Sequence, residues 1–155
     1  MADGKTFEYI RASASLPLVA KTVKLDGKLL LDGGISDSIP VKFALEKYQK
    51  CVVVLTQPES YLKHESSMLG LIKLLYKKYP KIVEAIKNRH IMYNKTVEYI
   101  NSLEKEGQVF VIRPSEILPI KRMCKDKEKL KETYNIGRTE ALKRLEDLKE
   151  YLNEA

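Results

Sequence analysis

The stretch Leu31-Asp32-Gly33-Gly34-Ile35-Ser36-Asp37-Ser38-Ile39-Pro40-Val41 gives the clearest indication of how this chain folds. It begins where an apolar run ends and passes through an Asp-Gly-Gly turn and a polar loop. It then reaches Pro40, a residue that suits the first turn of a helix. Residues 41–48 follow with a helical pattern of apolar side chains. The stretch therefore predicts a strand, a tight turn and a helix in succession.

A two-residue hairpin is predicted just before this stretch. Val23 and Leu25 precede the pair Asp26-Gly27, and the apolar residues of 28–31 follow it. Asp-Gly between two such segments is among the strongest short-range signs of a β-hairpin. We expect the opening of the chain to consist of short strands joined by tight turns.

Two further strands are predicted downstream. Cys51–Leu55 is a short, continuous apolar run rich in β-branched residues, which is typical of a central strand covered on both faces. Gln108–Ile112 has the same character and is stopped by Arg113-Pro114. Together these strands predict a small sheet.

The rest of the chain has helical periodicity. Apolar residues between 68 and 86 keep to one helical face, Pro80 marks a break or a new helix start, and Gly107 is placed as a C-cap. Asp126 is expected to cap a shorter helix that carries Leu130 and Tyr134. A final amphipathic helix is expected to carry one apolar stripe, formed by Ala141, Leu142, Leu145, Leu148 and Leu152.

Strands followed by helices, then a strand and helices again, predict an α/β fold in which helices pack on a small sheet. Doubly wound sheets usually have five or more strands, so this sheet is expected to be the C-terminal half of something larger.

Composition limits the class of protein. The chain has 155 residues, 44% of them hydrophobic, with 28 basic and 21 acidic side chains and a formal net charge of +7. Its longest strictly apolar run, Cys51–Leu55, is far shorter than a bilayer span, and the N-terminus has no apolar signal region. Cys51 and Cys124 form neither a Cys-x-x-Cys pair nor a zinc spacing. We expect a cytoplasmic protein with reduced thiols and no metal.

Asp32 is the best catalytic candidate from residue chemistry. A carboxylate directly after an apolar strand lies where open α/β sheets bind ligands. Gly33 and Gly34 would let the backbone take positive φ and approach a neighbouring group closely. The alternative is that Asp-Gly after a strand forms a turn and nothing more.

Three segments in order carry a resemblance to a known family. Ala12–Pro17, Leu25–Lys28 and Leu31–Val41 together resemble the second half of the patatin-like phospholipases, and the strand at 52–55 fits the same pattern. The later pieces Tyr79-Pro80, Asn88-Arg89-His90 and Tyr93-Asn94 look like a bacterial branch of that family with a helical C-terminal extension. The resemblance implies a catalytic-domain portion over residues 1–118, including a helical segment at 67–106, and an extension over 119–155.

The resemblance further implies a three-layer α/β fold and a Ser/Asp dyad without a cofactor, acting on lipid esters. Asp32 matches the catalytic aspartate, and Gly33 and Gly34 match the active-site turn. The family's nucleophile lies in Gly-x-Ser-x-Gly, which occurs nowhere in this chain. The nearest string, Gly34–Ser38, lacks the second glycine and follows the aspartate, so Ser36 is not accepted as the nucleophile. The chain is therefore predicted to be an inactive fragment on its own.

A second function class rests on charge. Residues 63–100 carry eight Lys or Arg and three Glu, which leaves +5 in that segment. Such a stretch fits either a solvated helix face or a non-catalytic module that binds an anionic membrane or a protein partner. No zinc-ligand set, aromatic stacking motif or Gly-x-x-Gly clamp favours nucleic acid.

Since a fragment leaves a strand edge and an apolar face uncovered, self-association is also expected.

The remaining candidates have structural interpretations. His64 and His90 lack diagnostic spacing for a triad, and His90 is expected to be packed or half-buried on a helix. Cys51 is expected to be a buried, inert thiol. Asp37 and Ser38 are expected to form local hydrogen bonds in the loop after Asp32.

Overall fold

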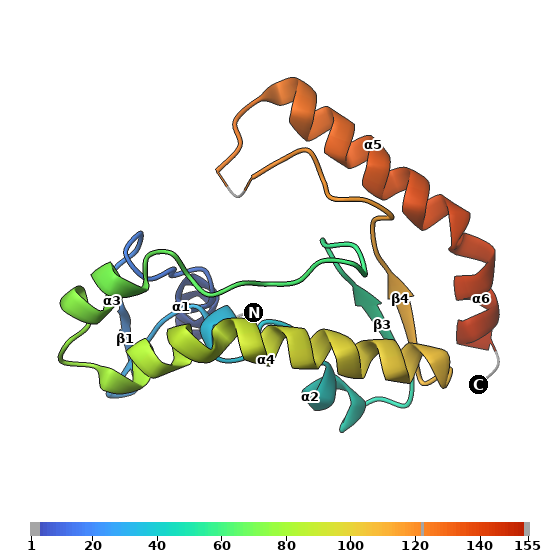
Figure 1. Ribbon diagram of the computed structural model, residues 1–155. Helices are drawn as coiled ribbons and strands as arrows, with labels where there is room; N and C mark the ends of the chain where they lie inside the picture. Colours follow the sequence, from blue (N-terminus) through green and yellow to red (C-terminus); the bar gives the residue numbers. More distant parts are fainter. Residues whose placement is uncertain (1–3, 122, 154–155) are drawn as a thin grey trace. The chain divides into compact units, whose positions relative to one another are not determined.

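The computed structural model describes residues 4–121 and 123–153 and is of mixed α/β class, as predicted (Figure 1). By its internal contacts the described chain divides into unit 1, residues 4–40 and 63–97, and unit 2, residues 41–62 and 98–153. The elements in chain order are α1 (Gly4–Ser13), β1 (Val23–Leu25), β2 (Lys28–Leu30), the 3-10 helix η1 (Gly33–Ile35), α2 (Val41–Leu45), β3 (Cys51–Val54), α3 (Leu69–Leu75), α4 (Pro80–Lys105), β4 (Val109–Ile112), α5 (Lys127–Lys143) and α6 (Leu145–Asn153).

The first described element is the helix α1, so the prediction that the opening consists only of strands and turns was wrong. The helix contains one buried residue, Ala12, and an i,i+3 pair between Glu8 and Arg11. Contacts distant in sequence also stabilise it: Lys5 Nζ lies 3.0 Å from Asp26 Oδ1, and the Tyr9 hydroxyl donates to Asp26 Oδ2. The hydrogen bond from Lys5 lowers the pKa of Asp26 and raises that of Lys5 itself.

The hairpin that follows is confirmed. β1 and β2 pair antiparallel, with Val23 opposite Leu30 and Leu25 opposite Lys28. Asp26 and Gly27 have φ values of 48° and 75°, as a type I′ turn requires at both central positions. The hairpin forms a sheet of its own, and a second sheet contains β3 and β4, so the described residues form two small sheets where one was expected.

Unit 1 has its core where α3 and α4 meet. Leu69 and Ile72 of α3 and Ile86 of α4 are buried together, and the partly buried side chains of Ile35 and Tyr76 pack against them. The break predicted at Pro80 is confirmed, because α3 ends at Leu75 and Pro80 is the first residue of α4. The segment after the Asp-Gly-Gly turn is thus packed directly on two helices.

Unit 2 has its core at the parallel pair β3 and β4, where Cys51 lies opposite Val109 and Val54 opposite Ile112. Residues 109–111 of β4 are buried, as are Ile100 and Leu103 from the last turns of α4. The prediction that β3 is covered on both faces was wrong, because Val54 is 69% exposed and Val52 is also exposed. Val53 is buried, so the face of β3 that carries Val52 and Val54 is open while the opposite face is covered. Among the described residues β3 pairs only with β4, which leaves its other edge unpaired.

The helix ends are formed as the sequence indicates, with two differences. Gly107 has φ of 71°, its N–H donates to Glu104 O, and Gln108 N–H donates to Leu103 O, which is the Schellman arrangement. The Asp126 side chain caps α5, as predicted. The predicted final stripe, however, is divided between α5 and α6, because the helix is interrupted at Arg144. α2 is also shorter than the predicted 41–48 segment.

Truncating Ile100 should test the core of unit 2. This side chain is fully buried, so Ile100→Ala leaves a cavity, and we expect a loss of about 2–5 kcal/mol in the free energy of unfolding. Ile91→Ala, at a 45% exposed position of the same helix, is the matched control and should change stability by less than about 1 kcal/mol. Urea unfolding followed by circular dichroism measures both. Equal losses would contradict this placement of the core.

In the part of the chain that the structure describes, none of the helices has both the length and the hydropathy needed to traverse a bilayer.

Candidate active site

Asp32 lies between β2 and η1, in unit 1. It is the N-cap of η1, and its Oδ1 accepts a hydrogen bond of 2.7 Å from Gly34 N–H. Its own N–H donates to Ser15 O at 2.9 Å, and Ser15, in the Ala12–Pro17 segment, is itself buried. The aspartate is half-buried. The bond to Ser15 holds the backbone of Asp32, and the bond from Gly34 N–H orients its carboxylate.

Gly34 is needed for close approach, and the expectation of positive φ at Gly33 and Gly34 was wrong. The glycines of the described chain with positive φ are Gly27 and Gly107. A Cβ added at Gly34 would lie 3.0 Å from Asp32 Oδ1 and 3.6 Å from Arg89 Nη2, whereas one added at Gly33 would meet nothing within 4 Å. The hydrogen bond from Gly34 N–H brings the carboxylate back over its own turn, so a side chain at Gly34 would require the carboxylate to shift by a few tenths of an ångström.

Arg89, on α4, contacts the same turn. Its Nε donates to Gly34 O at 2.6 Å, and the Ser38 hydroxyl donates to the same oxygen at 2.8 Å. A charged donor makes a stronger hydrogen bond than a neutral one, so Arg89 stabilises the position of the turn. Sequence reasoning did not assign this role. Asn88-Arg89-His90 contributed only to the family resemblance. Arg89 and Gly34 are 55 residues apart, so no local sequence pattern indicates their contact.

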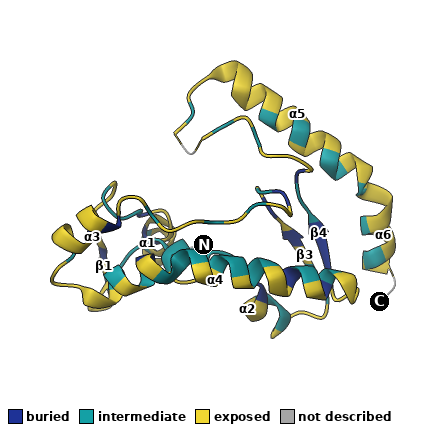
Figure 2. Ribbon diagram, viewed as in Figure 1, coloured by how far each residue is buried: buried dark blue, intermediate teal, exposed yellow. Residues whose placement is uncertain are grey.

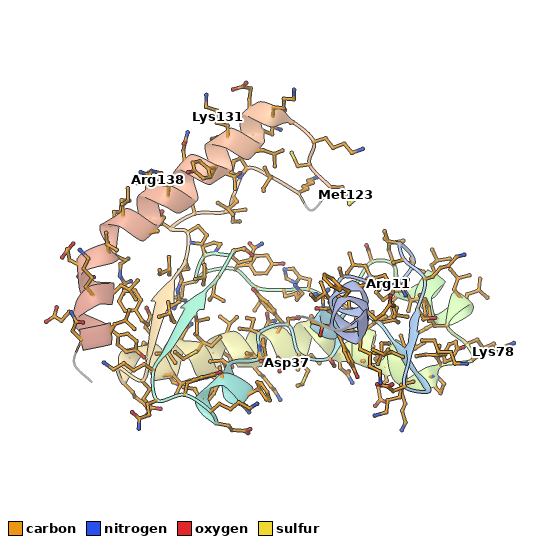
Figure 3. The ribbon with its side chains drawn as sticks, turned by 180° about the vertical axis from the view of Figure 1, so that it is seen from behind. Arg11, Asp37, Lys78, Met123, Lys131 and Arg138 are labelled. Carbon is orange, nitrogen blue, oxygen red and sulfur yellow. The ribbon has the colours of Figure 1, made fainter. Side chains whose placement is uncertain are left out.

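The serines nearest the turn do not form a dyad with Asp32. Ser36 Oγ donates to Gly33 O at 3.2 Å and Ser38 Oγ donates to Gly34 O. Asp37, labelled in Figure 3, accepts from Ile39 N–H. Because a hydroxyl has one proton to donate, neither serine presents that proton to Asp32. The expected local hydrogen bonding of Asp37 and Ser38 is confirmed.

Asp32 retains one carboxylate oxygen for chemistry. Oδ1 is occupied by Gly34 N–H, while within residues 4–121 and 123–153 no hydrogen bond is formed by Oδ2. An oriented carboxylate with a free oxygen can act as a general base toward a hydroxyl placed within hydrogen-bond distance.

The other candidates are not brought to Asp32. His64 is exposed, and His90 is half-buried, as expected for it, with its Nδ1 unpartnered among the described residues. Cys51 is half-buried, so the prediction of a buried thiol was wrong. It opens β3, and its N–H lies 3.1 Å from the Tyr151 hydroxyl. A groove between residues 115–119 and α5 lies in unit 2 and contains none of these candidates.

Two known families match separate parts of the chain. Residues 1–45 match the family described as patatin-like phospholipase, and residues 79–153 match a domain of unknown function, DUF6363. The uncharacterized protein YjjU of Escherichia coli (strain K12) is 30% identical over 139 residues, which cover 84% of this chain. The chain spans 38% of the length of that relative. No solved structure matches the chain.

The first match contains the β1–β2 hairpin and the Asp32 turn, whereas Arg89 lies in the second. The hydrogen bond from Arg89 to Gly34 therefore joins the two matched segments within unit 1.

Proposed function

We propose that this chain is the part of a serine lipid acyl hydrolase that provides the catalytic base, Asp32. The single observation that carries the proposal is the carboxylate of Asp32, which is oriented by Gly34 N–H through Oδ1 and whose Oδ2 forms no hydrogen bond with the described residues. The patatin-like match over residues 1–45 supports the reaction class. The activity of the whole protein, its lipid ester substrate and the position of its serine are parts of the proposal.

In the proposed reaction, a serine on a segment outside this chain donates its hydroxyl proton to Asp32 Oδ2 as its oxygen attacks the ester carbonyl carbon. The protonated Asp32 then passes that proton to the departing alcohol, which leaves an acyl-serine. In the second half, Asp32 takes a proton from water, the hydroxide attacks the acyl carbon, and the proton returns to serine with release of the fatty acid. Gly33 and Gly34 form the turn that places the carboxylate.

The test compares this chain with the extended protein, meaning the chain preceded by its in-frame upstream coding sequence. Hydrolysis of a soluble short-chain p-nitrophenyl ester is expected from the extended protein and not from residues 1–155 alone. Hydrolysis by the short chain would contradict the assignment of the nucleophile. No hydrolysis by the extended protein, or no Gly-x-Ser-x-Gly in it, would contradict the hydrolase proposal and favour a non-catalytic module.

Arg89 is proposed as a positioning residue. Arg89→Gln removes the charged donor to Gly34 O, and we expect it to lower kcat of the extended protein by about 10-fold with little change in KM. Arg89→Lys should recover part of the rate, because an ammonium can still donate to the same carbonyl. Lys95→Gln, an exposed position on α4, has the same charge change and should leave kcat within about twofold. An unchanged kcat in Arg89→Gln would contradict the positioning role.

A further inference from the structure

The outer side of α3 is apolar as well as its inner side. Leu69 and Ile72 pack into the core of unit 1, yet Leu71, Leu74 and Leu75 are exposed, with Leu74 at 72%. Met68 before the helix and Tyr79 after it are exposed too. We call these five exposed residues with Lys73, Lys77, Lys78 and Lys81 the α3 tip. Figure 2 shows the exposed side of α3 in yellow. A helix that is apolar on both sides needs a second apolar environment.

The charges of the α3 tip are all of one sign. Its four lysines are exposed, and residues 66–83 contain no aspartate or glutamate. None of the four forms an ion pair within the described residues. In Figure 3 the labelled Lys78 side chain points away from the neighbouring helices. The tip therefore combines uncovered leucines with uncompensated positive charge.

This combination of leucines and lysines favours a lipid surface over a protein partner. Protein interfaces are depleted of lysine at their centres, and a second copy of the α3 tip would bring eight lysines together. Amphipathic surfaces that lie in the membrane interface have the opposite composition, with leucines buried at the acyl boundary and lysines at the headgroups. Anionic headgroups would neutralise all four lysines while the leucines leave water.

We propose that the α3 tip docks on an anionic lipid surface, with Leu71, Leu74 and Leu75 inserted below the headgroups and the four lysines at them. Docking requires neither the serine nor Asp32, so this inference is independent of the proposed function. If both hold, the tip brings the chain to the surface where lipid esters are found.

Cosedimentation of the 155-residue chain with vesicles tests the docking. We expect binding to phosphatidylcholine vesicles that contain 30% phosphatidylglycerol, weak binding to pure phosphatidylcholine, and loss of binding as salt rises. Lys77→Gln/Lys78→Gln should lower the partition coefficient by about 30-fold, at about fivefold per lysine. Lys127→Gln/Lys131→Gln, the same charge change on α5, is the control and should lower it less than about threefold.

Insertion is tested separately from charge. The chain contains no tryptophan, so Leu74→Trp places a single tryptophan in the α3 tip, whose emission can be excited apart from that of the tyrosines. Its emission should shift to the blue on the anionic vesicles, while that of Tyr134→Trp, at a 65% exposed position of α5, should not. Leu74→Gln/Leu75→Gln should abolish most binding, whereas Leu142→Gln/Leu152→Gln at exposed positions of α5 and α6 should not.

Three outcomes of the vesicle experiments would overturn the docking proposal, and a fourth concerns the oligomeric state. The three are equal binding to neutral and anionic vesicles, equal losses in the tip and control variants, and an unshifted Leu74→Trp emission on vesicles that bind the chain. Leucine variants that convert an oligomer to a monomer without changing vesicle binding would also overturn it, because a second copy of the chain would then cover the tip.

Discussion

Replacing Asp32 by asparagine in the extended protein should lower kcat/KM for ester hydrolysis by about 10²- to 10⁴-fold, the range attributed to a general base. Asparagine has the same shape, and its amide oxygen can still accept the hydrogen bond from Gly34 N–H that Oδ1 accepts now. The turn is therefore expected to persist, while the basic oxygen at Oδ2 is lost.

The control for Asp32→Asn is Asp37→Asn. Asp37 lies in the same loop, and its replacement by asparagine is the same isosteric change. Within the described part of the chain its carboxylate accepts only a local hydrogen bond, from Ile39 N–H. We expect its kcat/KM to stay within about threefold of the parent protein. Equal rates in Asp32→Asn and Asp37→Asn would remove Asp32 from the reaction, provided that both variants keep the parent's melting temperature.

Gly34→Ala should lower kcat of the extended protein by about 10- to 100-fold, while Gly33→Ala should leave it nearly unchanged. The methyl group at Gly34 would lie 3.0 Å from Asp32 Oδ1, so the carboxylate must move by a few tenths of an ångström or more. Small displacements of a catalytic group have rate effects of this order. At Gly33 the added methyl group meets nothing within 4 Å.

The two alanine variants should be compared by kcat and by thermal unfolding. A parent-like melting temperature with a reduced kcat in Gly34→Ala places the effect in the position of the carboxylate. Should Gly33→Ala lose as much activity as Gly34→Ala, the rate would depend on turn flexibility and not on the space around Asp32.

Local chemistry explains which parts of the fold could be predicted from the sequence. The hairpin at Asp26-Gly27, the capping of α5 by Asp126 and the helix end at Gly107 each depend on side-chain or backbone preferences within a few residues. The Asp-Gly-Gly turn after β2 could be located for the same reason. Its hydrogen bond from Gly34 N–H to Asp32 is a two-residue contact.

Contacts between distant segments explain the failures. α1 has a single buried residue, and its Lys5 and Tyr9 side chains contact Asp26 of the hairpin, a contact that the local sequence of the helix does not indicate. A continuous apolar run such as Cys51–Leu55 predicts a strand but not which of its faces is covered. The hydrogen bond from Arg89 to Gly34 depends on how α4 packs on the turn, which the residues between them do not indicate.

Fluorophosphonate labelling read by intact mass tests the central claim most directly, namely that Asp32 of this chain acts on a serine outside it. We expect one equivalent of label on the extended protein, none on the 155-residue chain, and greatly slowed labelling when Asp32 is replaced by asparagine. Label on the 155-residue chain itself, on Ser36 or any other serine, would contradict the claim, as would labelling of the extended protein that is indifferent to Asp32→Asn.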